Sequence, residues 1–207
     1  MSKTIVIIDY GLGNLYSVLG AVERLGYKGK ISSKIEDMKK SDKLILPGVG
    51  AFADGMKNLK KLGLIEPLTK LVLKEKKPIL GICLGCQLMA KESFEFGHHK
   101  GLGWIDGSVI KLEPKNKELR VPHVGWDDLN QVKDNVIFEG IPKDALFYYT
   151  HSFHIKCNKK DDIIGECDYG GVFTCAFNHE NVYGTQFHPE KSQLHGLSML
   201  KNYLEKG

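Results

Sequence analysis

The sequence is most constrained by three short apolar segments that each run straight into a glycine-containing turn. They occupy residues 4–8, 43–46 and 78–82, and segments with helical periodicity separate them. A strand that is apolar along its whole length must be covered on both faces, as happens in a parallel sheet with helices on either side. The sequence therefore predicts an α/β fold with a doubly wound, mostly parallel sheet flanked by helices.

Helical periodicity is clearest in three segments. Apolar residues recur at three- and four-residue steps over residues 15–25, and a closing helix is expected over residues 193–205. A longer periodic segment covers residues 56–76, where we expect Gly63 and Pro67 to break the helix into pieces. These helices supply the covering layers that the apolar strands require.

The pattern changes after about residue 101, where shorter strands and turns replace the alternation of strand and helix. The predicted strands are 109–112, 146–150, 171–178 and 181–186. We therefore expect extra antiparallel strands in the C-terminal half. Since no repeat, linker or low-complexity stretch divides the chain, residues 1–207 are expected to form a single domain.

Composition limits the classes of function. The net charge of +4 with scattered lysine pairs gives no reason to expect nucleic acid, and no apolar run approaches the length of a membrane span. Five cysteines, an odd number without regular spacing, are typical of reduced thiols. We therefore expect a cytoplasmic enzyme that binds neither nucleic acid nor membrane.

One cysteine lies where the third apolar segment meets the next predicted helix. It is flanked by glycines in the segment Gly81-Ile-Cys83-Leu-Gly85, which has the form of a nucleophile elbow. Free backbone N–H groups at the start of the following helix favour a thiolate. Cys83 is therefore the candidate nucleophile, and a buried structural cysteine is the alternative.

A glycine turn follows the neighbouring apolar segment. It consists of Pro47, Gly48, Val49 and Gly50. The carboxyl ends of parallel strands meet at one edge of a sheet, so we expect this turn beside the elbow. A bare N–H from the turn, together with the N–H of Leu84, would form an oxyanion hole.

A histidine and a carboxylate stand two residues apart near the C-terminus. In the segment Gln186-Phe-His188-Pro-Glu190, the extended backbone before the proline allows both side chains to project to the same side. Glu190 can then orient the imidazole of His188, which completes a Cys-His-carboxylate relay. Surface or loop roles are expected for the histidines at 98, 99, 154, 179 and 195.

Several motifs together resemble the class I glutamine amidotransferases. They are the elbow at 81–87, the glycine turn at 47–50 and the His-Pro-Glu segment at 187–192. Three more segments resemble the glutaminase subunits of imidazole glycerol phosphate synthase: residues 9–14, 121–126 and 149–152. The likeness extends over residues 5–204.

The resemblance implies roles for individual residues. Cys83 would form a γ-glutamyl thioester with L-glutamine, His188 would act as acid and base, and Glu190 would orient His188. The α-amino and α-carboxylate groups of glutamine would be held by Gln87 and by the backbone around Thr150, His151 and Ser152.

The resemblance also implies a partner. In that family the ammonia passes to a (β/α)8-barrel cyclase/synthase subunit, which makes imidazole glycerol phosphate and an aminoimidazole carboxamide ribotide. The oxyanion strand from Gly48 to Gly50 would be fully aligned only when the partner's substrate is bound. The interface would lie at or near Asn14, Tyr148 and Lys191.

Three features leave other interpretations open. Cys83 and Cys86 form a C-x-x-C pair, where the family usually has methionine at the second position, and such a pair also occurs in redox proteins. Residues 92–97 and 126–128 are more like a related branch that supplies ammonia to a surface-polysaccharide sugar. Gly11 and Gly13 follow a strand as in a dinucleotide loop, but Tyr16 replaces the third glycine, so no cofactor is expected.

No metal site is expected either. The remaining cysteines, at positions 157, 167 and 175, are widely spaced and offer no second C-x-x-C pair.

Overall fold

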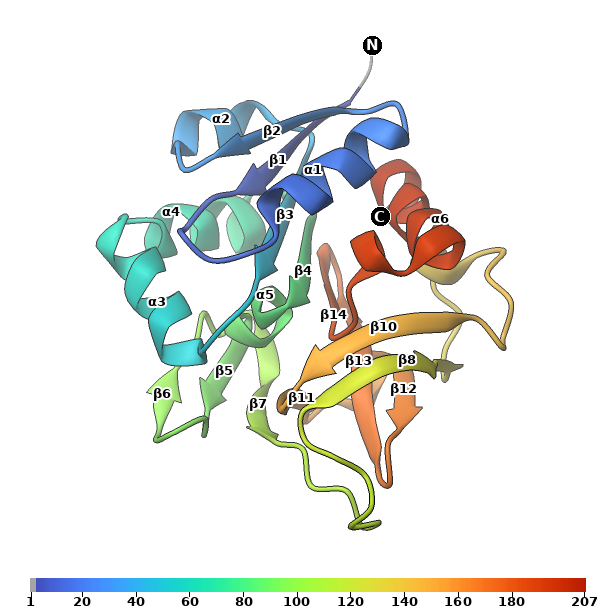
Figure 1. Cartoon of the computed structure of the whole chain (residues 1–207). Coiled ribbons are helices and arrows are strands. Elements are labelled where there is room, and N and C mark those ends of the chain that lie inside the picture. The colour runs from blue at the N-terminus through green and yellow to red at the C-terminus, as the bar shows by residue number, and fades with distance from the viewer. Residues whose placement is uncertain (1–2) are drawn as a thin grey trace.

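The computed structural model describes residues 3–207 and centres on one eight-stranded sheet (Figure 1). Its strand order is β2-β1-β3-β4-β14-β13-β12-β9. The first five strands in this order pair in parallel, and the last three are antiparallel to their neighbours. The strands are β1 (Thr4–Ile8), β2 (Lys28–Ser32), β3 (Lys43–Gly48), β4 (Ile79–Cys83), β9 (Asn130–Gln131), β12 (Ile163–Asp168), β13 (Val172–His179) and β14 (Val182–Thr185).

Helices cover both faces of the parallel part. On one face lie α1 (Leu15–Arg24) and α6 (Gln193–Lys206), which contribute Val18 and Leu200 to one hydrophobic cluster. The helices on the other face are α2 (Ile35–Lys40), α3 (Phe52–Lys61), α4 (Ile65–Thr69), the π-helix η1 (Lys70–Lys74) and α5 (Leu84–Leu88). This arrangement confirms the doubly wound α/β fold.

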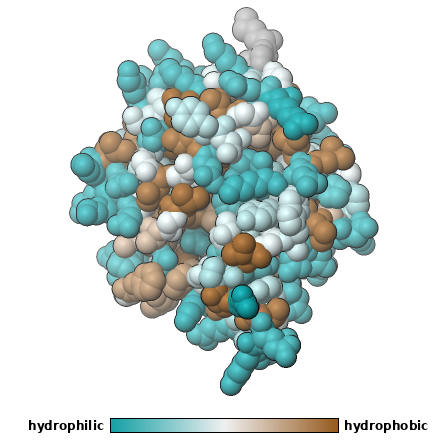
Figure 2. Space-filling view, viewed as in Figure 1, coloured by the Kyte–Doolittle hydropathy of each residue, from teal (hydrophilic) through white to brown (hydrophobic). Residues whose placement is uncertain are grey.

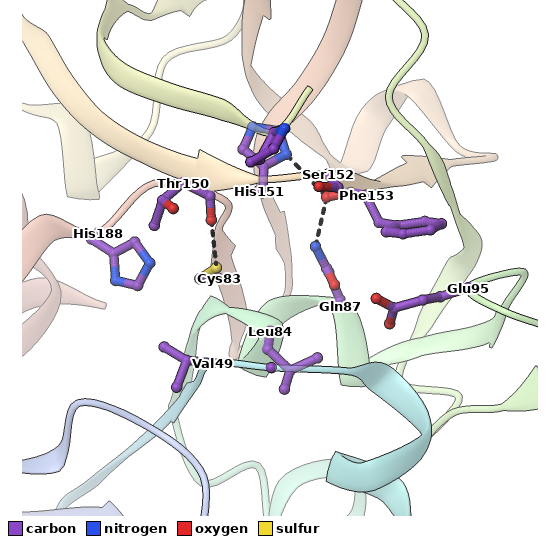
Figure 3. Close-up of a pocket in the computed structure, with 12 residues that line it drawn as sticks. Val49, Cys83, Leu84, Gln87, Glu95, Thr150, His151, Ser152, Phe153 and His188 are labelled. Atoms are coloured by element: carbon purple, nitrogen blue, oxygen red, sulfur yellow. Dashed lines mark hydrogen bonds between the residues drawn. The ribbon is translucent and has the colours of Figure 1, made fainter. Parts of the chain in front are cut away.

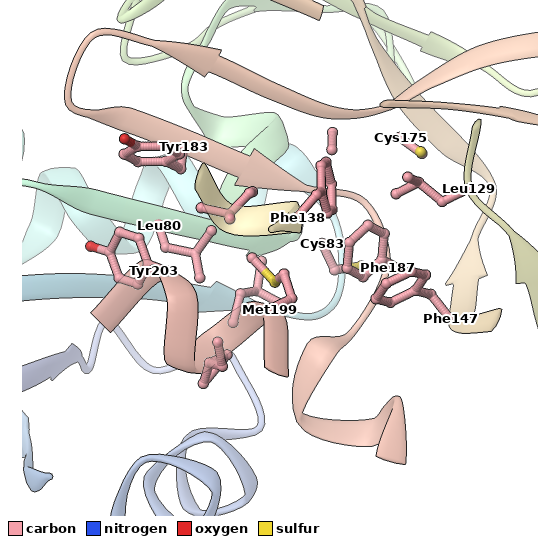
Figure 4. Close-up of a cluster of buried hydrophobic side chains, with 14 of the residues drawn as sticks. Leu80, Cys83, Leu129, Phe138, Phe147, Cys175, Tyr183, Phe187, Met199 and Tyr203 are labelled. Carbon is pink, nitrogen blue, oxygen red and sulfur yellow. The ribbon is translucent and has the colours of Figure 1, made fainter. Parts of the chain in front are cut away.

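The apolar strands face these two helical layers alternately. In β1, Ile5 and Ile7 pack into the cluster beneath α1 and α6, whereas Val6 and Ile8 pack into the cluster on the opposite face. All four side chains are fully buried, because successive residues of a strand point to opposite faces. Figure 4 shows part of the first cluster, in which Tyr203 and Met199 of α6 lie against the sheet.

Two small sheets extend the C-terminal half, as predicted. One pairs β8 (His123–Asp128) with β10 (Leu146–His151) in antiparallel fashion. The other has the order β11-β7-β5-β6, built from β5 (Ala90–Ser93), β6 (His99–Lys100), β7 (Ile105–Lys111) and β11 (Phe153–Cys157). Short 3-10 helices lie at η2 (Val136–Phe138), η3 (Lys160–Asp162) and η4 (Pro189–Lys191).

Two details differ from the sequence prediction. Gly63, with φ +66°, does separate α3 from α4, but Pro67 does not break the helix. It is the third residue of α4, within the first turn, where its missing N–H leaves no helical bond unmade. Strand β2 lacks a continuous apolar run because it is an edge strand with partly exposed side chains.

Within residues 3–207, the helices are all too short or too polar to cross a membrane. The prediction that residues 1–207 form one domain stays a prediction.

Candidate active site

The turn between β4 and α5 holds Cys83 in a strained backbone conformation. Its φ is +53°, a region that residues with a side chain rarely adopt, and such strain is common at functional sites. Space around the turn is very tight, because a methyl group on Gly85 would overlap the backbone carbonyl oxygen of Leu46. The predicted elbow is therefore present, and its second glycine is required by close approach to β3.

The glycine turn at the end of β3 lies directly beside the elbow. In the pairing of β3 with β4, Gly48 is opposite Cys83. A Cβ atom on Gly48 would lie 2.8 Å from the backbone nitrogen of Gly85, so the two turns are in close contact. Val49 and Gly50 follow at the rim of a pocket that Cys83 also lines.

The imidazole and the carboxylate of the predicted relay are paired and buried. His188 Nδ1 lies 2.8 Å from Glu190 Oε1, and the two side chains are only 2% and 1% exposed. The other ring nitrogen, Nε2, has no hydrogen-bond partner among residues 3–207. His188 lines the same pocket as Cys83 (Figure 3), whereas Glu190 is not part of the pocket lining.

The electrostatics of this pair favour a protonated imidazole. Burial alone lowers the pKa of His188, but the sulfur of Cys83 and the carboxylate of Glu190 act against burial and raise that pKa to about 10. A histidine in this setting can take the proton of the thiol and hold it at neutral pH. The arrangement therefore suits a thiolate–imidazolium pair.

The loop that carries His188 is fixed to β10. The backbone N–H of His188 donates to the carbonyl of Tyr148 at 2.9 Å. The hydroxyl of Ser192 donates to the carbonyl of His188 at 2.6 Å and accepts from the backbone N–H of Tyr148 at 2.9 Å. Three hydrogen bonds thus place the imidazole relative to the small antiparallel sheet.

A pocket of about 330 Å³ collects most of the predicted site residues. The predicted members of its lining are Val49, Gly50, Cys83, Leu84, Gln87, Thr150, His151, Ser152 and His188. Gly48 and Glu190 do not line the pocket; Gly48 contacts the elbow at Gly85, and Glu190 is paired with His188. Figure 3 shows the side chains converging on this space from β10, α5 and the His188 loop.

Sequence reasoning missed Glu95, an acidic residue in the pocket lining. Its carboxylate accepts a hydrogen bond from the backbone N–H of Phe52 at 2.6 Å, which holds it beside Gln87 at the mouth of the pocket (Figure 3). The residue lies in segment 92–97, whose sequence carried no catalytic pattern of its own. Only the folding of this segment over α5 brings the carboxylate to the site.

Buried histidines form a second polar cluster behind the pocket. His151 Nδ1 donates to the carbonyl of Phe153 at 3.0 Å, and His151 Nε2 lies 3.2 Å from Nδ1 of His123. Burial lowers the pKa of His151 to about 3, so its ring is neutral. His154 is also buried, which makes the predicted surface or loop role of that residue wrong: it lies in β11, where its ring packs against Phe173.

The second cysteine of the C-x-x-C pair lies in the core. Cys86 is 1% exposed, and burial, with Cys83 nearby, raises the pKa of its thiol well above the ordinary value. A redox pair needs an accessible sulfur and an easily formed thiolate. The environment of Cys86 supports a packing role.

Two of the residues predicted to contact a partner, Tyr148 and Lys191, lie side by side. Lys191 Nζ is 5.5 Å from the ring centre of Tyr148, and Trp126 packs edge-on against that ring. Lys191 also lines a shallow pocket with residues along α1, from Ser17 to Arg24. Figure 2 shows apolar patches interspersed with polar residues on the face viewed there.

Comparison with known proteins agrees with this site. The family described as Glutamine amidotransferase class-I matches residues 6–206. A solved structure titled as a glutamine amidotransferase has a TM-score of 0.74 at 20% identity, over 96% of this chain and 97% of that one. At that identity the structure shows the fold alone. The chain belongs to the class I glutamine amidotransferase family.

Curated relatives identify a narrower group within this class. The imidazole glycerol phosphate synthase subunit HisH 2 of Pseudomonas aeruginosa is 44% identical, over 97% of this chain and 98% of that protein. The subunit HisH 1 of Campylobacter jejuni is 46% identical, over 96% and 98%. HisH of Leptospira interrogans is 40% identical, over 95% and 97%. Within the class, the chain is thus grouped with the HisH subunits, which confirms the resemblance seen in its motifs.

Proposed function

We propose that this chain is the glutaminase subunit of an imidazole glycerol phosphate synthase, hydrolysing L-glutamine to glutamate and ammonia for histidine biosynthesis. The observation that carries this proposal is that Cys83 lines one pocket together with His188, whose imidazole is paired with Glu190. Family membership and the names of the curated relatives support the same activity.

The chemistry follows from the positions of three side chains. The Cys83 sulfur, having passed its proton to His188, attacks the side-chain amide carbon of glutamine. His188 then returns the proton to the leaving nitrogen, so that ammonia departs and a γ-glutamyl thioester remains. Water, deprotonated by the same imidazole, cleaves the thioester, and Glu190 stabilises the imidazolium at each stage.

Recognition of glutamine uses the opposite wall of the pocket. The carboxylate of Glu95 is suited to the α-ammonium group, and the side-chain oxygen of Gln87 offers a second acceptor beside it. The backbone around Thr150, His151 and Ser152 is assigned to the α-carboxylate. This arrangement distinguishes an amino acid from a simple amide.

The oxyanion would be held by the N–H of Leu84 and by the strand from Gly48 to Gly50. Gly50 has φ +102° and is exposed, so the peptide before it can rotate with little hindrance. One additional N–H directed at the oxyanion is worth about 10²–10³ in rate. We assign partner-dependent activation to this rotation.

The partner is a (β/α)8-barrel cyclase/synthase subunit in a heterodimer, with Asn14, Tyr148 and Lys191 at or near the interface. Ammonia would pass to that subunit without release. The nucleophile must remain a free thiol, and all five cysteines are unpaired, which suits the reducing cytoplasm. The relatives' names favour the imidazole-pathway acceptor over a surface-polysaccharide sugar.

The test is steady-state release of glutamate by the purified chain, alone and with the barrel subunit and its nucleotide acceptor. We expect slow hydrolysis alone and a rise of about 10²-fold or more in the loaded complex. A lone chain that already works at the rate of the complex would contradict the partner assignment. If a barrel protein activates the chain but the imidazole-pathway nucleotide has no effect, the acceptor would instead be assigned to the surface-polysaccharide sugar branch.

A further inference from the structure

A buried amide reaches the sulfur of Cys83 from behind the pocket. Gln186 is 1% exposed, and its Nε2 lies 3.7 Å from Cys83 Sγ. None of the steps above uses this side chain. It directly follows β14, two residues before His188, so the same segment presents both an amide and an imidazole to the nucleophile.

The orientation of the Gln186 amide is determined indirectly, through Gln87, by the backbone carbonyl of Phe153. Gln87 Nε2 lies 2.7 Å from the carbonyl oxygen of Phe153, which can only accept, so the nitrogen of Gln87 must point there. The same nitrogen lies 3.0 Å from Gln186 Oε1 and donates its other hydrogen to it. The Gln186 oxygen is therefore engaged, and its N–H group is the part that faces the sulfur.

A backbone oxygen lies on another side of the sulfur. The thiol can donate to the carbonyl of Thr150, whose oxygen is 3.9 Å from Sγ. That contact is favourable only while the sulfur carries its proton, whereas an N–H donor is most favourable to a sulfur with a negative charge. Gln186 and Thr150 thus stabilise opposite protonation states of Cys83.

We propose that Gln186 is a further catalytic residue, whose side-chain N–H holds the thiolate of Cys83 through an amide relay that begins at the Phe153 carbonyl. The proton released by the thiol goes to Nε2 of His188. Gln186 then supplies a neutral donor that does not compete for this proton. The inference rests on the proposed function, because it assumes that Cys83 is the nucleophile.

The experiment measures alkylation of Cys83 by iodoacetamide as a function of pH, with the modified peptide quantified by mass spectrometry. Gln186→Met keeps a similar volume without a donor. Gln186→Glu keeps the acceptor for Gln87 but places a carboxylate beside the sulfur. Gln131→Met, on strand β9 at the far edge of the sheet, is the matched control. Melting temperature is followed for every variant.

We expect alkylation of Gln186→Met near neutral pH to fall about tenfold, as for loss of one hydrogen bond to a charged group. The pH profile should move upward, further for Gln186→Glu, while Gln131→Met matches the unaltered chain. If Gln186→Met does not fold, the alkylation profile of Gln186→Glu alone tests the proposal. An unchanged alkylation profile in the folded variants overturns the proposal, even if glutaminase activity falls, because the side chain would then be structural.

The experiment separates this inference from the proposed function. If Cys83 in the unaltered chain is not alkylated, and Cys83→Ala still hydrolyses glutamine, the nucleophile assignment falls together with the inference. If Cys83 is alkylated normally and only the Gln186 variants show no effect, the proposed function stands and the role of Gln186 is wrong.

Discussion

The parallel and antiparallel halves of the molecule contribute to the site in different ways. The parallel strands β3 and β4 end in two turns that touch, and they deliver the nucleophile and the glycine strand by backbone geometry. His188 and Glu190 follow β14, and the antiparallel half holds their loop through hydrogen bonds between β10 and Ser192 and supplies walls of the pocket. One half thus positions atoms by close packing and the other by polar contacts.

The difference determines how each half should respond to substitution. A tightly packed turn cannot accept added atoms, whereas a hydrogen-bonded wall loses function when a donor or acceptor is removed. Substitutions in each half separate these two responses, and their expected effects range from an almost complete loss of activity to a small change in stability.

Cys83→Ala should have the largest effect on activity with little effect on the fold. Alanine and cysteine suffer the same strain at φ +53°, so stability should change little. Loss of the sulfur removes the covalent route, and glutamate release should fall by about 10⁴-fold or more. The measurements are steady-state glutaminase activity and thermal unfolding. Retention of even a tenth of the activity would show that Cys83 is not the nucleophile.

His188→Ala should be the next most damaging change. It removes proton transfer, which is worth about 10²–10⁴ in rate. Glu190→Gln leaves the imidazole in place with a poorer partner, so its loss should be smaller. Rates of glutamate release for both variants, compared at one pH, test this order. Full activity in both would remove the relay from the mechanism.

Much of the parallel half could be predicted from the sequence, because fully buried strands and flanking glycines leave a local pattern. The elbow at Cys83 was predictable for this reason, and so was its position beside the turn at Gly48. Contacts between segments that are distant in the sequence were less predictable. Glu95 and Gln186 are positioned by contacts between segments far apart in the chain, and no local sequence pattern predicts such contacts.

The packing of the elbow can be tested with a pair of glycines. Gly85→Ala would force a methyl group into the carbonyl of Leu46, so we expect a loss of about 3 kcal/mol in the free energy of unfolding. In Gly20→Ala, an exposed position in α1 with free space around it, we expect a gain of about 0.5–1 kcal/mol. Denaturant unfolding gives both values. A Gly85→Ala chain of normal stability would contradict the close approach of α5 to β3.

Cys86→Ala should have the smallest effect on function. The thiol is buried in the core, so its removal should cost about 1 kcal/mol of stability and leave the glutaminase rate within about twofold. Activity and unfolding measured on one preparation decide this. A large loss of activity, with the fold intact, would revive the C-x-x-C redox interpretation.

The central claim is that Cys83 and the His188–Glu190 pair form one nucleophilic relay, and a diazoketone analogue of glutamine tests it most directly. The analogue occupies the glutamine pocket, its diazo carbon takes up a proton, and an activated thiolate then displaces dinitrogen from that carbon to leave a stable thioether. After incubation, the modified residue is identified by peptide mapping while residual glutaminase activity is followed. We predict that Cys83 alone is modified, in proportion to the activity lost, and that His188→Ala slows the modification by about 10²-fold or more. Loss of activity with Cys83 unmodified, or equal labelling rates with and without His188, would contradict the relay.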